Sequence, residues 1–190
     1  MNLENSQISL FGSTSASKLD NEYFFIISPN DKIKEDVKFL KHKIGQKIPK
    51  NESLHSIAHI SLASIFGNND AFIINKINSA LLNQKSFLVS IKGCEIFQHG
   101  KVSKSLVLKV ENSEILKSLY TLLYLAFNLK DKRITPHITI AKSILLDDFD
   151  KIKSNLEEYD YQGDFFCDRV TLLRRHLNGS FTLIHETILK

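Results

Sequence analysis

A short pattern that occurs twice constrains this chain more than any other feature. Residues 135–142 read TPHITIAK, and residues 58–63 read AHISLA. In each, a histidine is followed by an apolar residue, a hydroxyl residue and another apolar residue. The two histidines, His59 and His137, lie 78 positions apart, so each half of the chain carries one copy.

A β-strand sends successive side chains to opposite faces. His59 and Ser61 are therefore expected on one face of a strand, and His137 and Thr139 on one face of another. Residues two apart along a strand are separated by roughly 6.6 Å, so an imidazole and a hydroxyl can contact the same small anion. Two such strands brought together would surround that anion.

The rest of the chain predicts strands and helices in an order that repeats. Each half reads β-α-β-α-β-β, with an extra strand, and each histidine strand is the second of its half. An internal duplication of this kind predicts an α+β fold with two pseudo-symmetric lobes of antiparallel sheet, helices on the outer faces and a central cleft. Strands are predicted near residues 23–27, 58–63, 87–91, 94–97, 105–110, 135–142, 165–174 and 181–189, and helices near 33–44, 73–81, 116–127 and 149–159.

Composition bounds the class of protein. The 190 residues are 43% hydrophobic and 24% charged, which is ordinary for a globular protein, and the net charge of +4 is too small for a dedicated duplex-binding protein. No apolar run approaches the roughly 20 residues that span a bilayer, and no secretory signal is evident. Cys94 and Cys167 lack metal-ligand spacing, so we expect reduced thiols and a cytoplasmic protein. Residues 1–20 predict a flexible tail, before a single bilobal domain at 21–190.

The repetition matters because one copy alone means little. About one chain in two of this length contains such a triplet by chance, and an isolated strand histidine is more often structural. Paired copies in equivalent positions favour function. Histidine has an unperturbed pKa of about 6.5, so one imidazole can accept a proton while the other donates one. Flanking hydroxyls can hydrogen-bond phosphate oxygens. This scheme requires neither metal nor cofactor.

At these residues the chain resembles the 2H phosphoesterase superfamily, which includes 2′-5′ RNA ligase-like proteins and 2′,3′-cyclic nucleotide phosphodiesterases. The resemblance covers residues 22–190 and implies a bilobal fold acting on cyclic phosphates or 2′-5′ linkages of nucleotides or RNA ends. It implies that His59 and His137 are the catalytic acid–base pair, and that Ser61 and Thr139 bind the phosphate. Threonine is commoner at the position of Ser61, but the hydroxyl is retained.

Other candidate residues carry weaker signals. Lys142 follows the second motif, where family members often carry a basic residue, but strict alternation points it away from the cleft unless the strand bulges. A charged, exposed turn is the favoured interpretation of Arg174, Arg175 and His176. The alternative is that they line a groove for the nucleotide. The remaining histidines are expected to be structural (42, 55, 99 and 185), and the aromatic residues at 161, 165 and 166 to belong to the core.

Several functions remain open at this stage. The leading hypothesis is a metal-independent phosphoesterase whose substrate is a nucleotide or an RNA terminus. A non-catalytic module that binds the same ligands is an alternative, as is a 2′-5′ RNA ligase using the same residues in reverse. A metal site at His59 and His137 is a weaker possibility. No membrane association and no obligate protein partner are inferred.

Overall fold

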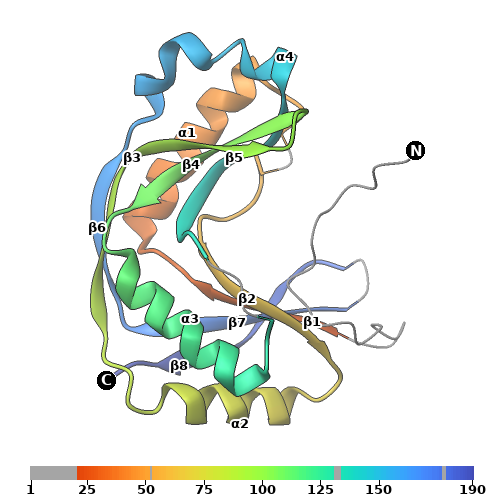
Figure 1. Ribbon diagram of the computed structural model, residues 1–190, viewed down its shortest axis with the longest axis vertical. Coiled ribbons are helices and arrows are strands. Elements are labelled where there is room, and N and C mark those ends of the chain that lie inside the picture. The colour runs from red at the N-terminus through yellow and green to blue at the C-terminus, as the bar shows by residue number, and fades with distance from the viewer. Residues whose placement is uncertain (1–20, 52, 131–133, 177–178) are drawn as a thin grey trace.

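The computed structural model describes residues 21–51, 53–130, 134–176 and 179–190 (Figure 1). The predicted flexible tail, the charged connection at 131–133 and Asn178 of the predicted final turn lie outside the described residues. The elements are β1 (Asn21–Ile27), α1 (Asp31–Lys47), β2 (Ile60–Gly67), α2 (Asp70–Leu81), β3 (Phe87–His99), β4 (Ser103–Val110), α3 (Ser113–Phe127), β5 (His137–Leu145), α4 (Leu146–Phe149), a 3₁₀ helix η1 (Lys153–Tyr159), β6 (Gln162–Cys167), β7 (Arg169–His176) and β8 (Thr182–Ile188).

All eight strands join one sheet in the order β6-β3-β4-β5-β2-β1-β7-β8, and neighbouring strands are antiparallel. The two motif strands, β2 and β5, lie at its centre and share a single bridge, Ile60 to Ile138. The sheet therefore divides into two four-stranded halves that meet at the motifs. Figure 1 shows α1 and α4 with the β5 half and α2 and α3 with the β2 half. The predicted α+β class with two pseudo-symmetric lobes is confirmed.

The helices are exchanged between the halves. Helix α1 follows β1 in the chain but packs against β5, and α3 follows β4 but packs against β2. The apolar residues of both motifs lie under these helices. Ile60, Ile138 and Ile140 are fully buried and Leu62 is 2% exposed, as the alternation of the motif predicts. The opposite face of the sheet carries the motif histidines.

Asparagine residues precede two of the helices, and their side chains have different partners. The Asn69 side chain accepts a hydrogen bond from the Phe72 N–H at 3.0 Å, so it caps the N-terminus of α2. Asn112 precedes α3 but does not cap it with its side chain. Its amide instead bonds the backbone of β3 at Ser90 and Leu88. No described helix is long and apolar enough to cross a membrane.

Three boundaries differ from the prediction. Gly93 does not end a strand, because it takes a positive φ of 77° at a bulge and β3 continues to His99. The single strand expected over 165–174 is two strands separated at Asp168, and the helix expected over 149–159 is the short α4 followed by η1. Its predicted apolar residues still reach the core, since Phe149, Ile152 and Tyr159 are buried.

Candidate active site

The two motif strands carry the same irregularity at the same position. In β2, Leu62 has no partner on β1, because Ser61 pairs with Ile26 and Ala63 with Phe25. In β5, Ile140 has no partner on β4, because Thr139 and Ala141 pair with adjacent residues. Each bulge lies three residues after the motif histidine. The symmetry between the halves therefore extends to the backbone geometry of the motifs.

Each histidine is held by the backbone in the same way. His59 Nδ1 lies 2.8 Å from the Ile57 carbonyl oxygen, and His137 Nδ1 lies 2.6 Å from the Thr135 carbonyl oxygen. A carbonyl only accepts, so Nδ1 must carry the hydrogen in each bond. In the neutral imidazole this tautomer leaves the lone pair on Nε2. Both rings therefore keep Nε2 for accepting or donating a proton.

An aromatic ring supports each imidazole. Phe24 of β1 contacts His59 edge-on, with ring centroids 5.5 Å apart and an interplanar angle of 87°. Phe97 of β3 contacts His137 at 4.8 Å and 72°. Such edge-to-face contacts are the preferred aromatic geometry. The sequence predicted neither partner, because both lie on other strands and are paired with the motifs only by the sheet.

Burial and nearby charges shift both imidazoles in the same direction. Burial lowers the pKa of His59 from its ordinary value, the hydrogen bond to Ile57 opposes this, and the positive charges of Lys41 and His137 lower it further. Burial also lowers the pKa of His137, while the Thr135 hydrogen bond and the Glu95 carboxylate raise it. Burial thus favours the neutral form of both imidazoles. The nearby charges differ in sign, since Lys41 is a cation near His59 and Glu95 is an anion near His137.

The hydroxyl residues lie on the histidine-bearing face. Ser61 is exposed and Thr139 is half-buried, whereas the apolar residues on either side of each are buried. Since β2 and β5 are adjacent at Ile60 and Ile138, the two hydroxyls and the two histidines flank the junction between the halves. The structure thus brings the four predicted site residues to one region of the sheet.

The bulge in β5 changes the interpretation of Lys142. Ile140 and Ala141 are both buried in succession, so the alternation of the strand is reset and Lys142, which is exposed, falls on the same face as His137 and Thr139. Strict alternation along the sequence would instead place Lys142 on the face opposite His137. Strict alternation from the histidine fails here because the strand contains an extra residue.

A buried lysine that the sequence did not single out lies behind the first motif. Lys41 of α1 is 2% exposed, and its Nζ donates to the Ser56 carbonyl at 2.7 Å and to the Ser56 hydroxyl at 2.8 Å. Burial lowers the pKa of this ammonium to about 8. The next residue, Ile57, provides the carbonyl that holds His59. Lys41 therefore fixes the loop on which the His59 tautomer depends.

The same loop also reaches the second motif strand. Ser53 Oγ lies 3.1 Å from the Ile140 carbonyl oxygen and accepts the Lys142 N–H at 3.1 Å. Asn51 Oδ1 lies 3.3 Å from that N–H. The loop between α1 and β2 thus contacts both motif strands, and it holds β5 at its bulge.

Several other predicted residues have structural partners. Arg174 and Arg175 lie on β7, not in a turn; Arg174 pairs with Asp70 at 2.5 Å and Arg175 pairs with Glu22. His99 Nε2 lies 2.7 Å from the Ser105 hydroxyl. Phe165 is 3% exposed, as expected for the core, but Phe166 is 62% exposed. In the described part of the chain, no three His, Cys, Asp or Glu side chains are grouped to hold a metal ion.

Comparison with solved structures shows where this fold recurs. The chain is similar to TT0787 of Thermus thermophilus, at 14% identity and a TM-score of 0.64, over 88% of this chain and 97% of the other. It is similar to Escherichia coli LigT complexed with phosphate, at 16% identity and 0.62, over 90% and 99%. It is also similar to Kluyveromyces marxianus Usb1, at 11% and 0.53, over 89% and 98%. At these identities the likeness shows the fold.

A family model carries the comparison further. The curated proteins give no match to this sequence. The model of the 2′-5′ RNA ligase superfamily matches residues 29–179, which include both histidine motifs and most of the sheet. The resemblance on which the sequence analysis relied is thereby confirmed, and this chain belongs to the 2′-5′ RNA ligase superfamily, the 2H phosphoesterases.

Proposed function

We propose that this protein is a phosphoesterase that opens 2′,3′-cyclic phosphates or cleaves 2′-5′ linkages in nucleotides or at RNA ends, with His59 and His137 as its acid–base pair. The observation that carries the proposal is the matched tethering of the two imidazoles. Each Nδ1 is bound to the carbonyl two residues earlier, and each ring precedes an identical bulge. A structural histidine needs neither this symmetry nor a partner.

The reaction balances with these groups alone. One neutral imidazole accepts a proton at Nε2 from water as the water oxygen bonds to phosphorus. The opposite imidazole, protonated, donates its Nε2 proton to the ribose oxygen as the bond from phosphorus to that oxygen breaks. The products are a phosphomonoester and a free ribose hydroxyl. Exchange of one proton between each histidine and solvent restores the starting state.

The hydroxyls and a cation complete the proposed site. Ser61 and Thr139 are positioned to hydrogen-bond the non-bridging phosphate oxygens, where negative charge changes during the reaction. Lys142 now joins them as a candidate, since the bulge in β5 brings it to their face. Solved structures of LigT include complexes with phosphate and with 3′-AMP. Those ligands are of the class we propose for this chain.

The test is turnover of a nucleoside 2′,3′-cyclic phosphate and of a 2′-5′ dinucleotide, with and without a chelator, by the wild type, by two single variants and by the double variant that combines them. His59→Ala and His137→Ala are each expected to lower kcat by about 10²- to 10⁴-fold, the contribution of one general acid or base. His42→Ala is the matched control, because it alters a histidine on α1 outside the motifs.

Each result has a distinct meaning. Unchanged turnover in the double variant would reject the two-histidine assignment. Saturable binding of the nucleotide with no product at any pH would identify a binding module. Joining of RNA ends in preference to hydrolysis would identify a ligase, and activity lost only with the chelator would identify a metal-dependent enzyme.

A further inference from the structure

A strip of apolar side chains crosses the β2 half of the sheet on the histidine-bearing face. Phe24 of β1 pairs with Leu173 of β7, which pairs with Leu183 of β8. Phe181, just before β8, packs on Phe24 with ring centroids 5.5 Å apart. Leu183 is 59% exposed, and the other three are half-buried. We call these four residues the apolar strip.

The strip begins at the proposed catalytic centre. Phe24, its first residue, is also the ring that contacts His59 edge-on. Adjacent strands are about 4.8 Å apart, so β1 and β7 lie about 5 and 10 Å from β2. A nucleoside whose phosphate lies beside His59 and Ser61 can therefore extend along the strip. The helices pack on the other face of the sheet, and none of the four side chains of the strip belongs to the hydrophobic core.

Polar residues border the strip on both sides. On one side Arg175 lies 4.5 Å above the Phe181 ring and pairs with Glu22, which also accepts a bond from the Ser64 hydroxyl at 3.0 Å. This border keeps part of its surface open to solvent, since the Arg175 side chain is 37% exposed. It therefore offers both a donor and an acceptor next to the strip.

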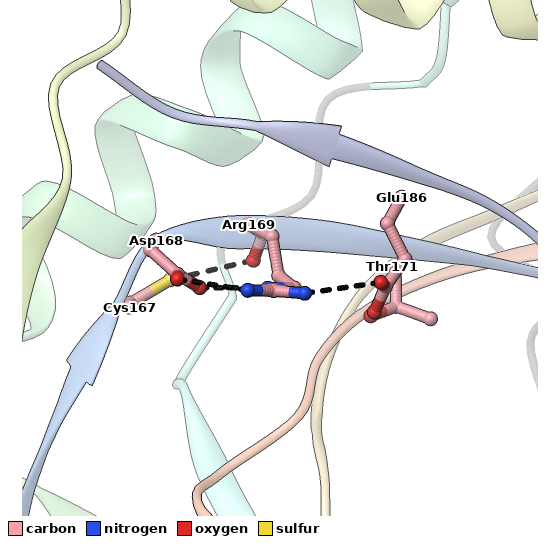
Figure 2. A network of polar contacts seen from close by, with 5 residues as sticks. All are labelled: Cys167, Asp168, Arg169, Thr171 and Glu186. Carbon is pink, nitrogen blue, oxygen red and sulfur yellow. Dashed lines mark hydrogen bonds and ion pairs between the residues drawn. The ribbon is translucent and has the colours of Figure 1, made fainter.

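The other border is the polar network in Figure 2. Arg169 is held between Asp168, at 2.8 Å, and Glu186, at 3.2 Å. Thr171 pairs with Glu186 across β7 and β8 and with Ile26 of β1, which in turn pairs with Ser61. This row thus runs parallel to the strip and leads to the proposed phosphate site. One guanidinium is shared by two carboxylates, so this border carries a net negative charge and offers carboxylate acceptors beside the strip.

An apolar surface with donors and acceptors along its edges fits a flat, uncharged ring that carries hydrogen-bonding groups. Nucleobases have this character, and they stack on aromatic side chains and on arginine planes. We propose that the apolar strip is a base-stacking subsite, which binds the nucleobase of the nucleoside whose phosphate lies at His59. This inference rests on the proposed function, and it places the substrate's base on the His59 side of the site, not on the His137 side.

The test compares two substrates that differ only in the base: adenosine 2′,3′-cyclic phosphate and methyl riboside 2′,3′-cyclic phosphate. The wild type is expected to prefer adenosine in kcat/KM. Phe181→Ala and Leu183→Ser should each lower this preference by roughly 5- to 100-fold, the range for one stacked base, chiefly through KM. Phe181→Trp should maintain or increase it. Phe72→Ala is the control, because Phe72 is 57% exposed on α2.

A preference that survives both Phe181→Ala and Leu183→Ser would overturn the subsite, even where total activity falls. Because Leu183 is exposed, its variant reports on the subsite even if Phe181→Ala unfolds. If the wild type turns over neither substrate, the proposed function fails separately, and equilibrium binding then tests the subsite. Leu183→Ser should weaken binding of 3′-AMP relative to ribose phosphate, and equal binding of 3′-AMP by variant and wild type would overturn it.

Discussion

The two histidines have the same local geometry but different electrostatic surroundings. Lys41, a cation, lowers the pKa of His59, whereas Glu95, an anion, raises the pKa of His137. A positive charge on His99 lowers the pKa of His137 and so opposes the effect of Glu95. Burial lowers the pKa of both imidazoles, but the neighbouring charges act in opposite directions, because Lys41 disfavours a proton on His59 and Glu95 favours one on His137. Chemically identical side chains can thus be assigned different starting roles by their neighbours.

A first prediction concerns the pH dependence of catalysis. Burial lowers the pKa of both histidines below the ordinary value of about 6.5. The singly protonated pair is most abundant between the two pKa values, so kcat/KM should follow a bell with its optimum below about pH 6.5. It falls at higher pH as the acid loses its proton, and at lower pH as the base gains one.

Measurement of kcat/KM between about pH 4 and pH 9 tests this, because kcat/KM reports the free enzyme. An optimum above about pH 7 would contradict it. The bound phosphate favours the protonated imidazoles, so the kcat profile, which reports the complex, should lie at higher pH than that of kcat/KM.

At the scale of the secondary structure elements, the sequence predicted what local periodicity encodes. The alternation of Ile60 with Ser61 and of Ile138 with Thr139 predicted correctly which side chains of the motifs are buried. For Lys142, strict alternation and a bulge predict opposite faces, and the choice between them lies in the pairing of β5 with β4, which the sequence does not encode locally. Local periodicity did not distinguish Lys41 from the other lysines of α1, since its acceptor, Ser56, lies in a loop whose path depends on tertiary packing.

The link from α1 to the loop before β2 gives a second prediction. Lys41→Met removes the charge that lowers the pKa of His59 and the donor that holds Ser56. The pKa of His59 should therefore rise, and the limb of the pH profile that belongs to it should move to higher pH. A displaced Ile57 carbonyl should also lower kcat, by on the order of 10-fold or more.

Proton NMR titration of the histidine C2 protons measures the shift, with His59→Ala identifying the signal. Lys38→Met is the matched control, because the Lys38 side chain lies on the same helix and is 77% exposed. A lower kcat without a change in the pKa of His59 would mean that Lys41 acts only by packing.

The whole molecule joins two half-sheets at the point where the proposed chemistry occurs. One bridge, Ile60 to Ile138, is the strand pairing between the halves that the structure describes. The helices add to it, since α1 packs on β5 and α3 packs on β2. Strand β3 adds a covalent connection, because it follows α2 of one half and pairs with β4 of the other. The relative position of the two histidines therefore depends on this bridge, on the core under the two exchanged helices, and on the loop before β2, which contacts both motif strands.

Ser53 tests this dependence, because it joins the loop to β5 from a position that is 5% exposed. Ser53→Ala removes the hydroxyl that bonds the Ile140 carbonyl and the Lys142 N–H, so buried backbone groups lose a partner. The free energy of unfolding should fall by about 1–3 kcal/mol, with an unchanged m-value in urea. Ser118→Ala, on the exposed surface of α3, should change it by less than about 0.5 kcal/mol.

If the loop sets the spacing of the two motifs, Ser53→Ala should also lower kcat under conditions where the protein stays folded, because β5 would be free to shift at its bulge. A loss of stability equal to that of Ser118→Ala, or a full kcat in the folded variant, would show that the halves are held in register without this contact.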